Sequence, residues 1–561
     1  MIVMQIILNN KYIKNKLNAF LPIALSILIL SCNSPNYNNT HKRIFHYNES
    51  KDIATLDPAY ARNLAKVWPV NQLFNGLLQL DDSLQIKACI SYKWEISPDG
   101  RVYTFHLRND VYFHDNALFR SGKGRKVVAS DFVYSFNRLL DPAIASPGAW
   151  VFNFVNGNES NTTNGFKAIN DSTIQIFLKS PFPAFLGLLT IAYCFVVPKE
   201  IVTYYGRDFR NHPVGTGPFK FKLWTEGEKL ILLKNENYFE KDINGTKLPK
   251  IDGVSISFIA DKQSEFLEFI KGRLDFISGV NASFKDELLT PTGKLNPAYS
   301  SKFNMLVCPY LNTEYLGILV DTSLEIVRKS PLHDKLIRQA INLSIDRKKM
   351  ISNLRNNIGF PANSGFIPKG MPSFSASDVH GYNYNPDSAR KLLVKSGHPG
   401  GKGLGPIKIV TVSDYSDICE YVQHELEQVG IPIEVEIVTG LSYREMIANS
   451  RVSLFRASWV ADYPDAENYL ALFYGPNLCP KGPNYTRFRN TTYDKLYELS
   501  LKEPDLFKRE KLYHQMDQTI INEALTIPLY YDVAVRFTKK NIYNLGINPM
   551  NNLILKYVEI K

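Results

Sequence analysis

The chain has 561 residues and a formal net charge of +11 at pH 7, and 45% of its residues are hydrophobic, 12% aromatic and 21% charged. A chain of this length is too long for a single hydrophobic core, which predicts about two or three lobes. The hydrophobic share is that of a soluble globular protein. Because Lys and Arg are interleaved with 54 acidic residues and cluster only briefly, as at residues 347–349, the charge describes a solvated surface and argues against nucleic-acid binding.

The N-terminal segment has the features of a secretion signal. A basic part at residues 11–16 precedes an apolar run from Phe20 to Leu30 that is too short to cross a bilayer. We therefore interpret residues 1–31 as a signal peptide that is removed on export. The following residues, 32–44, are polar and rich in turn formers, which indicates a flexible tether. No later apolar run approaches the length of a membrane span.

Cys32 ends a short motif, Ile29-Leu30-Ser31-Cys32, that resembles the bacterial lipobox. In that motif the cysteine is diacylated through its sulfur and becomes the mature N-terminus. Each buried methylene contributes about 0.8 kcal/mol, so two or more acyl chains attach a protein stably to a membrane. The resemblance implies a lipoprotein anchored through Cys32, and the alternative is an ordinary secretory signal with an incidental cysteine.

The remaining cysteines are far apart in the sequence. An odd number of thiols cannot all pair, so no disulfide framework is predicted even though an oxidising compartment would allow one. Neither Cys-x-x-Cys nor His-Glu-x-x-His spacing occurs, which argues against structural zinc. We expect neither a metal nor a cofactor. The five cysteines are Cys89, Cys194, Cys308, Cys419 and Cys479.

The first folded region predicts a β-hairpin followed by a helix. Apolar residues alternate with polar ones on both sides of the turn at residues 97–100, which is typical of a hairpin with one buried face. Farther on, Ser130 and Asp131 are expected to cap a helix whose inward face includes Phe132 and Phe136. The apolar hairpin positions are Trp94, Ile96, Tyr103, Phe105 and Leu107.

These segments and several later ones, taken in order, resemble the family-5 bacterial extracellular solute-binding proteins, the oligopeptide- and dipeptide-binding components of ABC importers. The resemblance covers nearly the whole mature chain, and it depends on the order of many motifs that are individually weak. The motifs are Trp94 with Ser97 to Gly100, Tyr103 to Arg108, Val111 to Asp115, Ser130 to Arg138, Pro213 to Phe219, Gly272 to Asp275, Ile337 to Asn342, Tyr384 to Pro386 and Pro528 to Tyr531.

We interpret these motifs as scaffold and not as ligand contacts. Gly215 and Gly217 are expected to adopt backbone angles closed to other residues. Asn385 as a cap and Pro386 at the first helical position predict the start of a helix. The stripe that includes Ile341 predicts the buried face of another helix.

The resemblance implies an α/β, two-lobed periplasmic-binding-protein fold of class II and of the large cluster-C type, with an extra subdomain inserted in lobe one. Alternation of strands and helices after residue 210 agrees with α/β lobes. Two crossing strands would form the hinge. The expected boundaries are residues 45–78, 213–303 and 523–561 for lobe one, 79–212 for the inserted subdomain and 304–522 for lobe two.

The segment Leu454 to Leu470 carries a pattern suited to a zwitterionic ligand. A peptide has an ammonium group at one end and a carboxylate at the other, so its site needs an acid and a base. Asp462 and Arg456 supply both charges, with Trp459 between them. Taken alone, the pattern is equally compatible with an ordinary salt bridge at a sheet edge.

The resemblance assigns roles to this segment residue by residue. Asp462 stands at the position that pairs with the ligand's α-ammonium, and Arg456 at one that takes the ligand's carboxylate at certain ligand lengths. Ser458 stands where many relatives have glycine, which would narrow the site. The residues expected to line the cleft are Ser458, Trp459, Ala461 and Tyr463, with Trp68 and Trp150 from the other lobe on position alone, where a core role is equally open.

These features imply a binding protein without enzymatic activity, which captures an oligopeptide or dipeptide between its lobes and delivers it to an ABC permease. We expect a monomer that is anchored by its lipid to a bacterial membrane and faces the periplasm. One alternative is the same fold binding a nickel chelate, haem, a sugar or an opine. The other is an envelope hydrolase or structural protein, and no Gly-x-Ser-x-Gly nucleophile motif supports hydrolysis.

Overall fold

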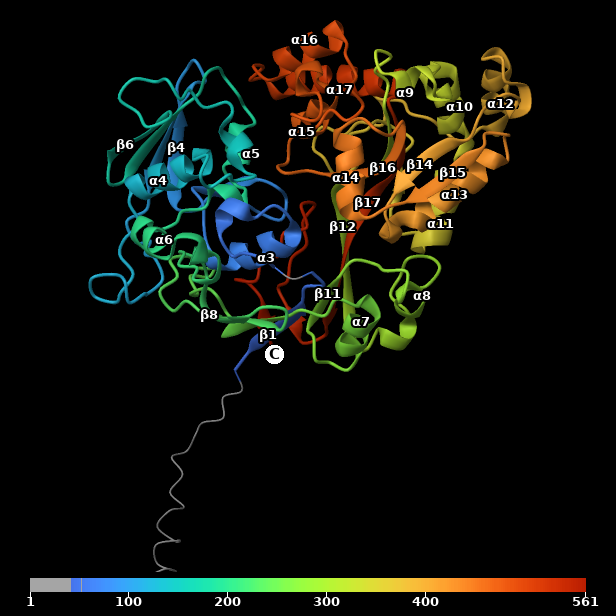
Figure 1. Ribbon diagram of the computed structural model, residues 1–561. Helices are drawn as coiled ribbons and strands as arrows, with labels where there is room; N and C mark the ends of the chain where they lie inside the picture. The colour runs from blue at the N-terminus through green and yellow to red at the C-terminus, as the bar shows by residue number, and fades with distance from the viewer. Residues whose placement is uncertain (1–41, 52) are drawn as a thin grey trace, which may run out of the picture. The chain divides into compact units, whose positions relative to one another are not determined.

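A computed structural model describes residues 42–51 and 53–561 (Figure 1). The predicted signal peptide, Cys32 and the tether up to residue 41 lie outside these residues. Residues 44–561 form one compact unit of mixed helix and strand. None of the described helices combines the length and the apolar character that crossing a bilayer requires.

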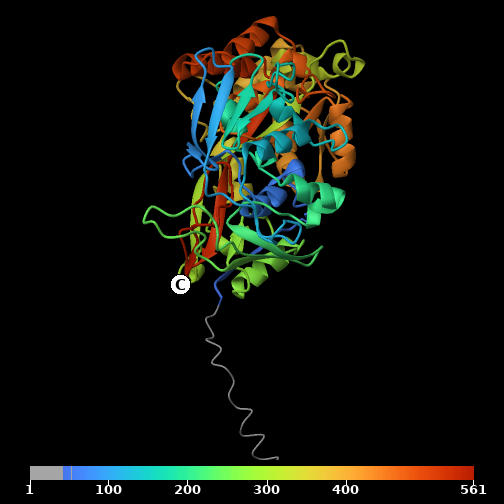
Figure 2. The same ribbon diagram turned by 90° about the vertical axis from the view of Figure 1, so that its left-hand side faces the viewer.

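The largest sheet is built around two long antiparallel strands, β12 (Phe303–Ile318) and β17 (Thr526–Lys539). The two strands run side by side in both views (Figures 1 and 2). On the β12 side the sheet continues through β16 (Leu454–Val460), β14 (Ile407–Thr411) and β15 (Ile433–Ile437). On the β17 side it continues through β11 (Phe276–Ser278), β1 (Ile44–Asn48), β10 (Gly253–Ser257), β9 (Lys229–Lys234) and β8 (Phe219–Thr225), and β13 (Phe360–Pro361) also pairs with β17.

Pairing between the two long strands breaks in the middle. It runs from Phe303 opposite Lys539 to Pro309 opposite Val533, shifts register, and resumes at Thr313 opposite Tyr531. Such an irregularity bends the strand that carries the extra residues. β11 joins β17 on one side of the break and β16 joins β12 on the other, so the long strands connect two halves of the sheet.

Helices cover the half of the sheet that contains β14 to β16, and one of them begins where the sequence predicts. Asn385 accepts a hydrogen bond from the Ser388 N–H and Pro386 opens α12 (Pro386–Lys395), which confirms that prediction. In α10 (Lys335–Ser344), Ile341 is fully buried, as the stripe predicts. The other helices of residues 262–522 are α7 (Lys262–Ile270), α8 (Lys285–Leu288), α9 (Glu325–Arg328), α11 (Arg347–Arg355), α13 (Ser416–Glu427), α14 (Gly440–Ala448), α15 (Glu467–Leu470), α16 (Thr491–Ser500) and α17 (Leu506–Asn522).

A second sheet contains the predicted hairpin, which is confirmed as β4 (Ser91–Ile96) and β5 (Val102–Leu107). The β5 residues alternate between buried and half-buried, whereas Ile96 on β4 is 44% exposed. The sheet continues through β7 (Thr173–Phe177) and β6 (Phe166–Asn170). Nearby helices are α3 (Leu64–Leu73), α4 (Ala129–Leu140), α5 (Phe185–Leu188) and α6 (Lys199–Tyr205), and the short strands β2 (Leu78–Leu80) with β3 (Ile86–Ala88) and β18 (Ile542–Tyr543) with β19 (Glu559–Ile560) form separate pairs.

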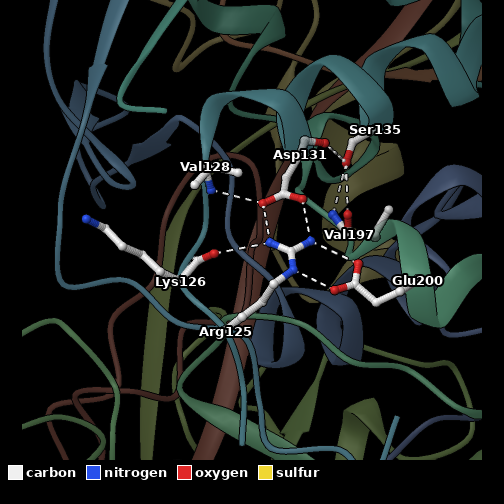
Figure 3. A network of polar contacts seen from close by, with 7 residues as sticks. All are labelled: Arg125, Lys126, Val128, Asp131, Ser135, Val197 and Glu200. Carbon is white, nitrogen blue, oxygen red and sulfur yellow. Dashed lines mark hydrogen bonds and ion pairs between the residues drawn. The ribbon is translucent and has the colours of Figure 1, made fainter. Parts of the chain in front are cut away.

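Asp131 stabilises the start of α4, although from a different position than expected. The helix begins one residue earlier than Ser130, and Asp131 accepts a hydrogen bond from the Val128 N–H at 2.9 Å. Its carboxylate also accepts two bonds from the Arg125 guanidinium, at 2.6 and 2.8 Å (Figure 3). Arg125 binds Glu200 of α6 through two further nitrogen–oxygen contacts, so one cation ties α4 to α6.

The glycines of the segment 213–219 serve a different purpose than predicted. Neither Gly215 nor Gly217 is among the residues with positive φ, so the expectation of special backbone angles is wrong. A Cβ on Gly215 would lie 2.0 Å from the Leu73 carbonyl oxygen, and one on Gly217 would lie 2.4 Å from the Leu73 carbonyl carbon. The glycines are therefore required because the backbone at the end of α3 passes too close for a side chain.

This contact predicts that Gly215→Ala lowers the free energy of unfolding by about 1–3 kcal/mol, because backbone atoms cannot move aside as a flexible side chain would. Gly405→Ala is the matched control, since nothing lies within 4 Å of its added Cβ. Urea unfolding followed by circular dichroism measures both variants. Equal stability of the two would contradict the close approach at Leu73.

Candidate functional site

The described residues enclose a cavity of about 1060 Å³. Small-molecule sites occupy roughly 300–1,000 Å³. This cavity lies at the upper end of that range and therefore has room for a short peptide. One wall comes from residues 61–80, 190–195 and 550–556. The opposite wall comes from residues 458–462, which end β16, together with Tyr310 and Tyr415.

Asp462 lies at the start of the loop after β16, and its side chain is open to the cavity. Asn468 of α15 positions it: the Asn468 Nδ2 donates to Asp462 Oδ2 at 3.3 Å, and the Asn468 Oδ1 accepts from the Asp462 N–H at 3.2 Å. The same Oδ1 accepts from the indole N–H of Trp459 at 2.9 Å. One amide side chain therefore fixes both the acid and the neighbouring aromatic ring.

The surroundings of Asp462 disfavour its charged form. Burial among protein atoms raises the pKa of this carboxyl above its usual value, and the hydrogen bond from Asn468 and the positive charge of Arg62 oppose that rise. Within residues 42–51 and 53–561, Asp462 forms no ion pair at contact distance. A cationic ligand group would supply the missing partner.

Behind this wall lies the buried acid Glu467, which is hydrogen-bonded to two tyrosine hydroxyl groups. Glu467 accepts hydrogen bonds from the hydroxyl groups of Tyr463 and Tyr497. Burial raises the pKa of Glu467 to about 7, although both hydrogen bonds act in the opposite direction. The centroid of the Tyr463 ring is 6.3 Å from that of Trp150, so the segment behind this wall packs near an aromatic residue of the cavity lining.

Arg456 is buried and already paired. It forms an ion pair with Glu314 on the neighbouring strand β12, and its guanidinium carbon lies 3.1 Å from the ring centroid of Tyr415. Tyr415 lines the cavity, whereas Arg456 does not. In this structure the guanidinium is therefore behind the wall of the cavity.

The Arg456–Glu314 pair belongs to a polar network at the break between the long strands. Asn312 lies in that break and donates to Glu314 at 3.1 Å and to Asp532 at 3.2 Å. Asp532 in turn accepts from Arg355 at 2.6 Å. Buried charges of both signs thus compensate one another at the point where the two halves of the sheet meet.

The structure brings five of the eight sequence-predicted ligand residues to the cavity. Besides Arg456, Tyr463 and Trp68 are outside the lining, and Tyr463 directs its hydroxyl group to Glu467. Trp68 is 6% exposed and donates its indole N–H to the Asn551 carbonyl at 2.9 Å, which is the core role left open above. The residues that line the cavity are Asp462, Ser458, Trp459, Ala461 and Trp150.

Sequence reasoning missed several cavity residues. Arg62 and Asn63 precede α3, and only the helix-capping signal of Asn63 was readable in the sequence. Tyr193, Tyr310 and Tyr415 come from three separate regions. These three tyrosines meet only when the chain folds, and no local sequence pattern predicts that they line one cavity. Asn468 was also missed, although it lies only six residues after Asp462.

The described residues contain no candidate metal site and no candidate redox site. No group of three or more His, Cys, Asp or Glu side chains there is arranged to hold a metal ion. The cysteines of this part of the chain are free thiols, and four of the five are buried. Burial raises the pKa of Cys89 to about 12, which keeps that thiol protonated and unreactive.

Comparison with known proteins extends the resemblance over almost the whole chain. The dipeptide-binding protein DppE of Bacillus subtilis is 24% identical over 539 residues, which cover 92% of each chain. The periplasmic oligopeptide-binding protein OppA of Salmonella typhimurium is 25% identical over 531 residues, which cover 91% of this chain and 92% of OppA.

A solved structure confirms the fold. The periplasmic binding protein DppA of Helicobacter pylori, solved in complex with the peptide STSA, superimposes with a TM-score of 0.75 at 23% identity, over 92% of this chain and 98% of its own. The two-lobed α/β fold of periplasmic binding proteins is thus confirmed. Residues 85–478 match the model of the bacterial extracellular solute-binding proteins, family 5 middle region. The chain therefore belongs to the family-5 bacterial extracellular solute-binding proteins, which serve ABC importers as binding components and not as enzymes.

Proposed function

We propose that this solute-binding protein captures peptides in the cavity and holds their free amino terminus through Asp462. The single observation that carries the proposal is a carboxylate that faces the cavity, is fixed by Asn468 and has no cation at contact distance among the described residues. Taking a carboxylate out of bulk water is costly unless a cation joins it. The α-ammonium group of a peptide meets that need.

The lining fits a ligand that is recognised mainly through groups common to all peptides. Trp150 and Trp459 offer apolar surface on opposite walls, while Asn63 and Asn71 offer amide groups that donate and accept hydrogen bonds. A main chain held between such groups binds with little regard to its side chains. The relatives DppE and OppA carry dipeptide- and oligopeptide-binding names, which agrees with this class of ligand.

We further propose that the ligand is trapped by closure of the two lobes, with lobe one formed by residues 45–78, 213–303 and 523–561 and lobe two by residues 304–522. The break in pairing between β12 and β17 supplies a place where the strands can bend. A peptide that contacts both walls stabilises the closed form by those differential contacts, and the closed form is what the permease would bind.

The proposed location is the periplasmic side of a bacterial membrane, with the mature chain attached through acylated Cys32 and acting as a monomer. This part of the proposal is supported by the lipobox-like residues 29–32 and by the membership in a family of extracellular binding proteins. A tether of polar residues would let the lobes reach the permease from the anchor.

Removing the acid tests the site directly. We predict that Asp462→Ala weakens binding of tetra-alanine by a factor of a hundred or more, about 3 kcal/mol, because the ligand ammonium loses its partner. Isothermal titration calorimetry on the chain without its first 32 residues measures the affinity. The matched control is Asp171→Ala, which removes the same charge from an exposed turn outside the cavity lining and should bind as the parent does.

N-acetylated tetra-alanine completes this test, because it lacks the ammonium group. The parent protein should bind it about as weakly as the Asp462→Ala variant binds the free peptide. If acetylation leaves the affinity of the parent unchanged, the ligand amine is not recognised and the peptide assignment of Asp462 is wrong.

The lipid anchor has its own test. In cells that express the full chain and are fed radiolabelled palmitate, the protein should become labelled and sediment with membranes, because the Cys32 thiol carries the diacylglycerol. Cys32→Ser should abolish both the label and the sedimentation. A labelled Cys32→Ser variant, or an unlabelled parent protein, would show that the cysteine is incidental.

A further inference from the structure

The charges that line the cavity do not balance. Among the described residues the lining contains one acid, Asp462, and three bases, Lys51, Arg62 and Lys556. Lys556 is neutralised, because it pairs with the half-buried Glu240 and donates to Gln79 Oε1 at 2.8 Å. Lys51 and Arg62 then face a single carboxylate, which leaves one positive charge in excess at the wall.

Arg62 is the better placed of the two free bases. It lies between Tyr60, whose carbonyl accepts the Arg62 N–H at 2.8 Å, and Asn63, which caps α3, so the backbone at this point is held on both sides. Its side chain is exposed to the cavity and forms no ion pair at contact distance within the described part of the chain. Its guanidinium is therefore available to a ligand.

Arg62 and Asp462 line the same cavity, together with Tyr193. The positive charge of Arg62 is among the influences on the pKa of both Asp462 and Tyr193. A peptide whose ammonium group meets Asp462 would therefore lie in the same cavity as the Arg62 guanidinium.

A zwitterionic peptide adds no net charge to the cavity. Its ammonium group would pair with Asp462, the one acid among the described lining residues. On the basis of the peptide capture proposed above, we infer that Arg62 binds a carboxylate of the ligand close to its amino terminus, so that the cavity selects acidic or very short peptides over basic ones. The carboxylate is either the side chain of Asp or Glu at the first positions or the C-terminal carboxylate of a dipeptide. In both cases the guanidinium forms a charge-assisted pair with it.

Calorimetry with matched peptides separates the two sources of the carboxylate. For an acidic side chain, Glu-Ala-Ala-Ala is compared with Gln-Ala-Ala-Ala, which has the same shape without the charge. For the C-terminal group, Ala-Ala is compared with its amide. We expect the charged member of at least one pair to bind about tenfold more tightly or better, and Lys-Ala-Ala-Ala to bind most weakly.

The variant Arg62→Gln should remove that preference while it binds the uncharged member of each pair as the parent does. The matched control is Lys66→Gln, which removes one positive charge from the first turn of α3 at a position outside the lining and should keep the preference. Preference in both pairs, or in either one, supports the role of Arg62 and identifies the source of the carboxylate.

Failure of this inference is distinguishable from failure of the proposed function. If the parent binds the peptides but shows no preference in either pair, or if Arg62→Gln keeps the preference, the role of Arg62 is wrong and peptide capture stands. If the parent binds none of these peptides, both proposals are wrong.

Discussion

An acid that faces a cavity without a cation beside it is the constraint around which the rest of this molecule can be understood. The Asp462 side chain is open to the cavity, yet the protein atoms around it raise the pKa of its carboxyl, and Asn468 holds it in place. Proteins rarely keep such a group unless something pairs with it. In the function proposed above, the walls of the cavity, the lobes that carry them and the strands that join the lobes bring a ligand to this carboxylate.

Two bases at or behind the cavity wall are already paired with acids of the chain. Arg456 is paired with Glu314, and Lys556 is paired with Glu240. Because these bases are already neutralised, they contribute rigidity to the walls and not a free charge to the cavity. Among the described lining residues, the charges that remain for a ligand are Asp462, Lys51 and Arg62. In the proposal above, Asp462 takes the ammonium group of a short peptide and Arg62 takes its carboxylate.

Local patterns in the sequence predicted local structure well. The hairpin of β4 and β5 and the start of α12 at Pro386 follow from alternation and capping, which involve residues close in the chain. The segment that ends β16 was predicted as a ligand site from its acid and its indole, and both residues line the cavity; their contact with a ligand stays a prediction. Patterns of this kind involve residues that are close in the sequence, so they can be recognised without knowing the fold.

What could not be predicted depends on contacts between distant segments. The pairing of Arg456 with Glu314 arises because β12 lies next to β16, across 142 residues of sequence. The requirement for glycine at position 215 comes from the end of α3, and Arg62 reaches the cavity because its loop faces β16 in space. In each case the sequence shows the residue type but does not show which distant residue it contacts in the fold.

A crystal structure of the mature protein with bound tetra-alanine tests the central claim most directly. The account predicts that the peptide lies in the cavity between the walls, with its ammonium nitrogen about 2.7–2.9 Å from a carboxylate oxygen of Asp462. A peptide bound elsewhere, or bound in the cavity with its ammonium group directed away from Asp462, would contradict it.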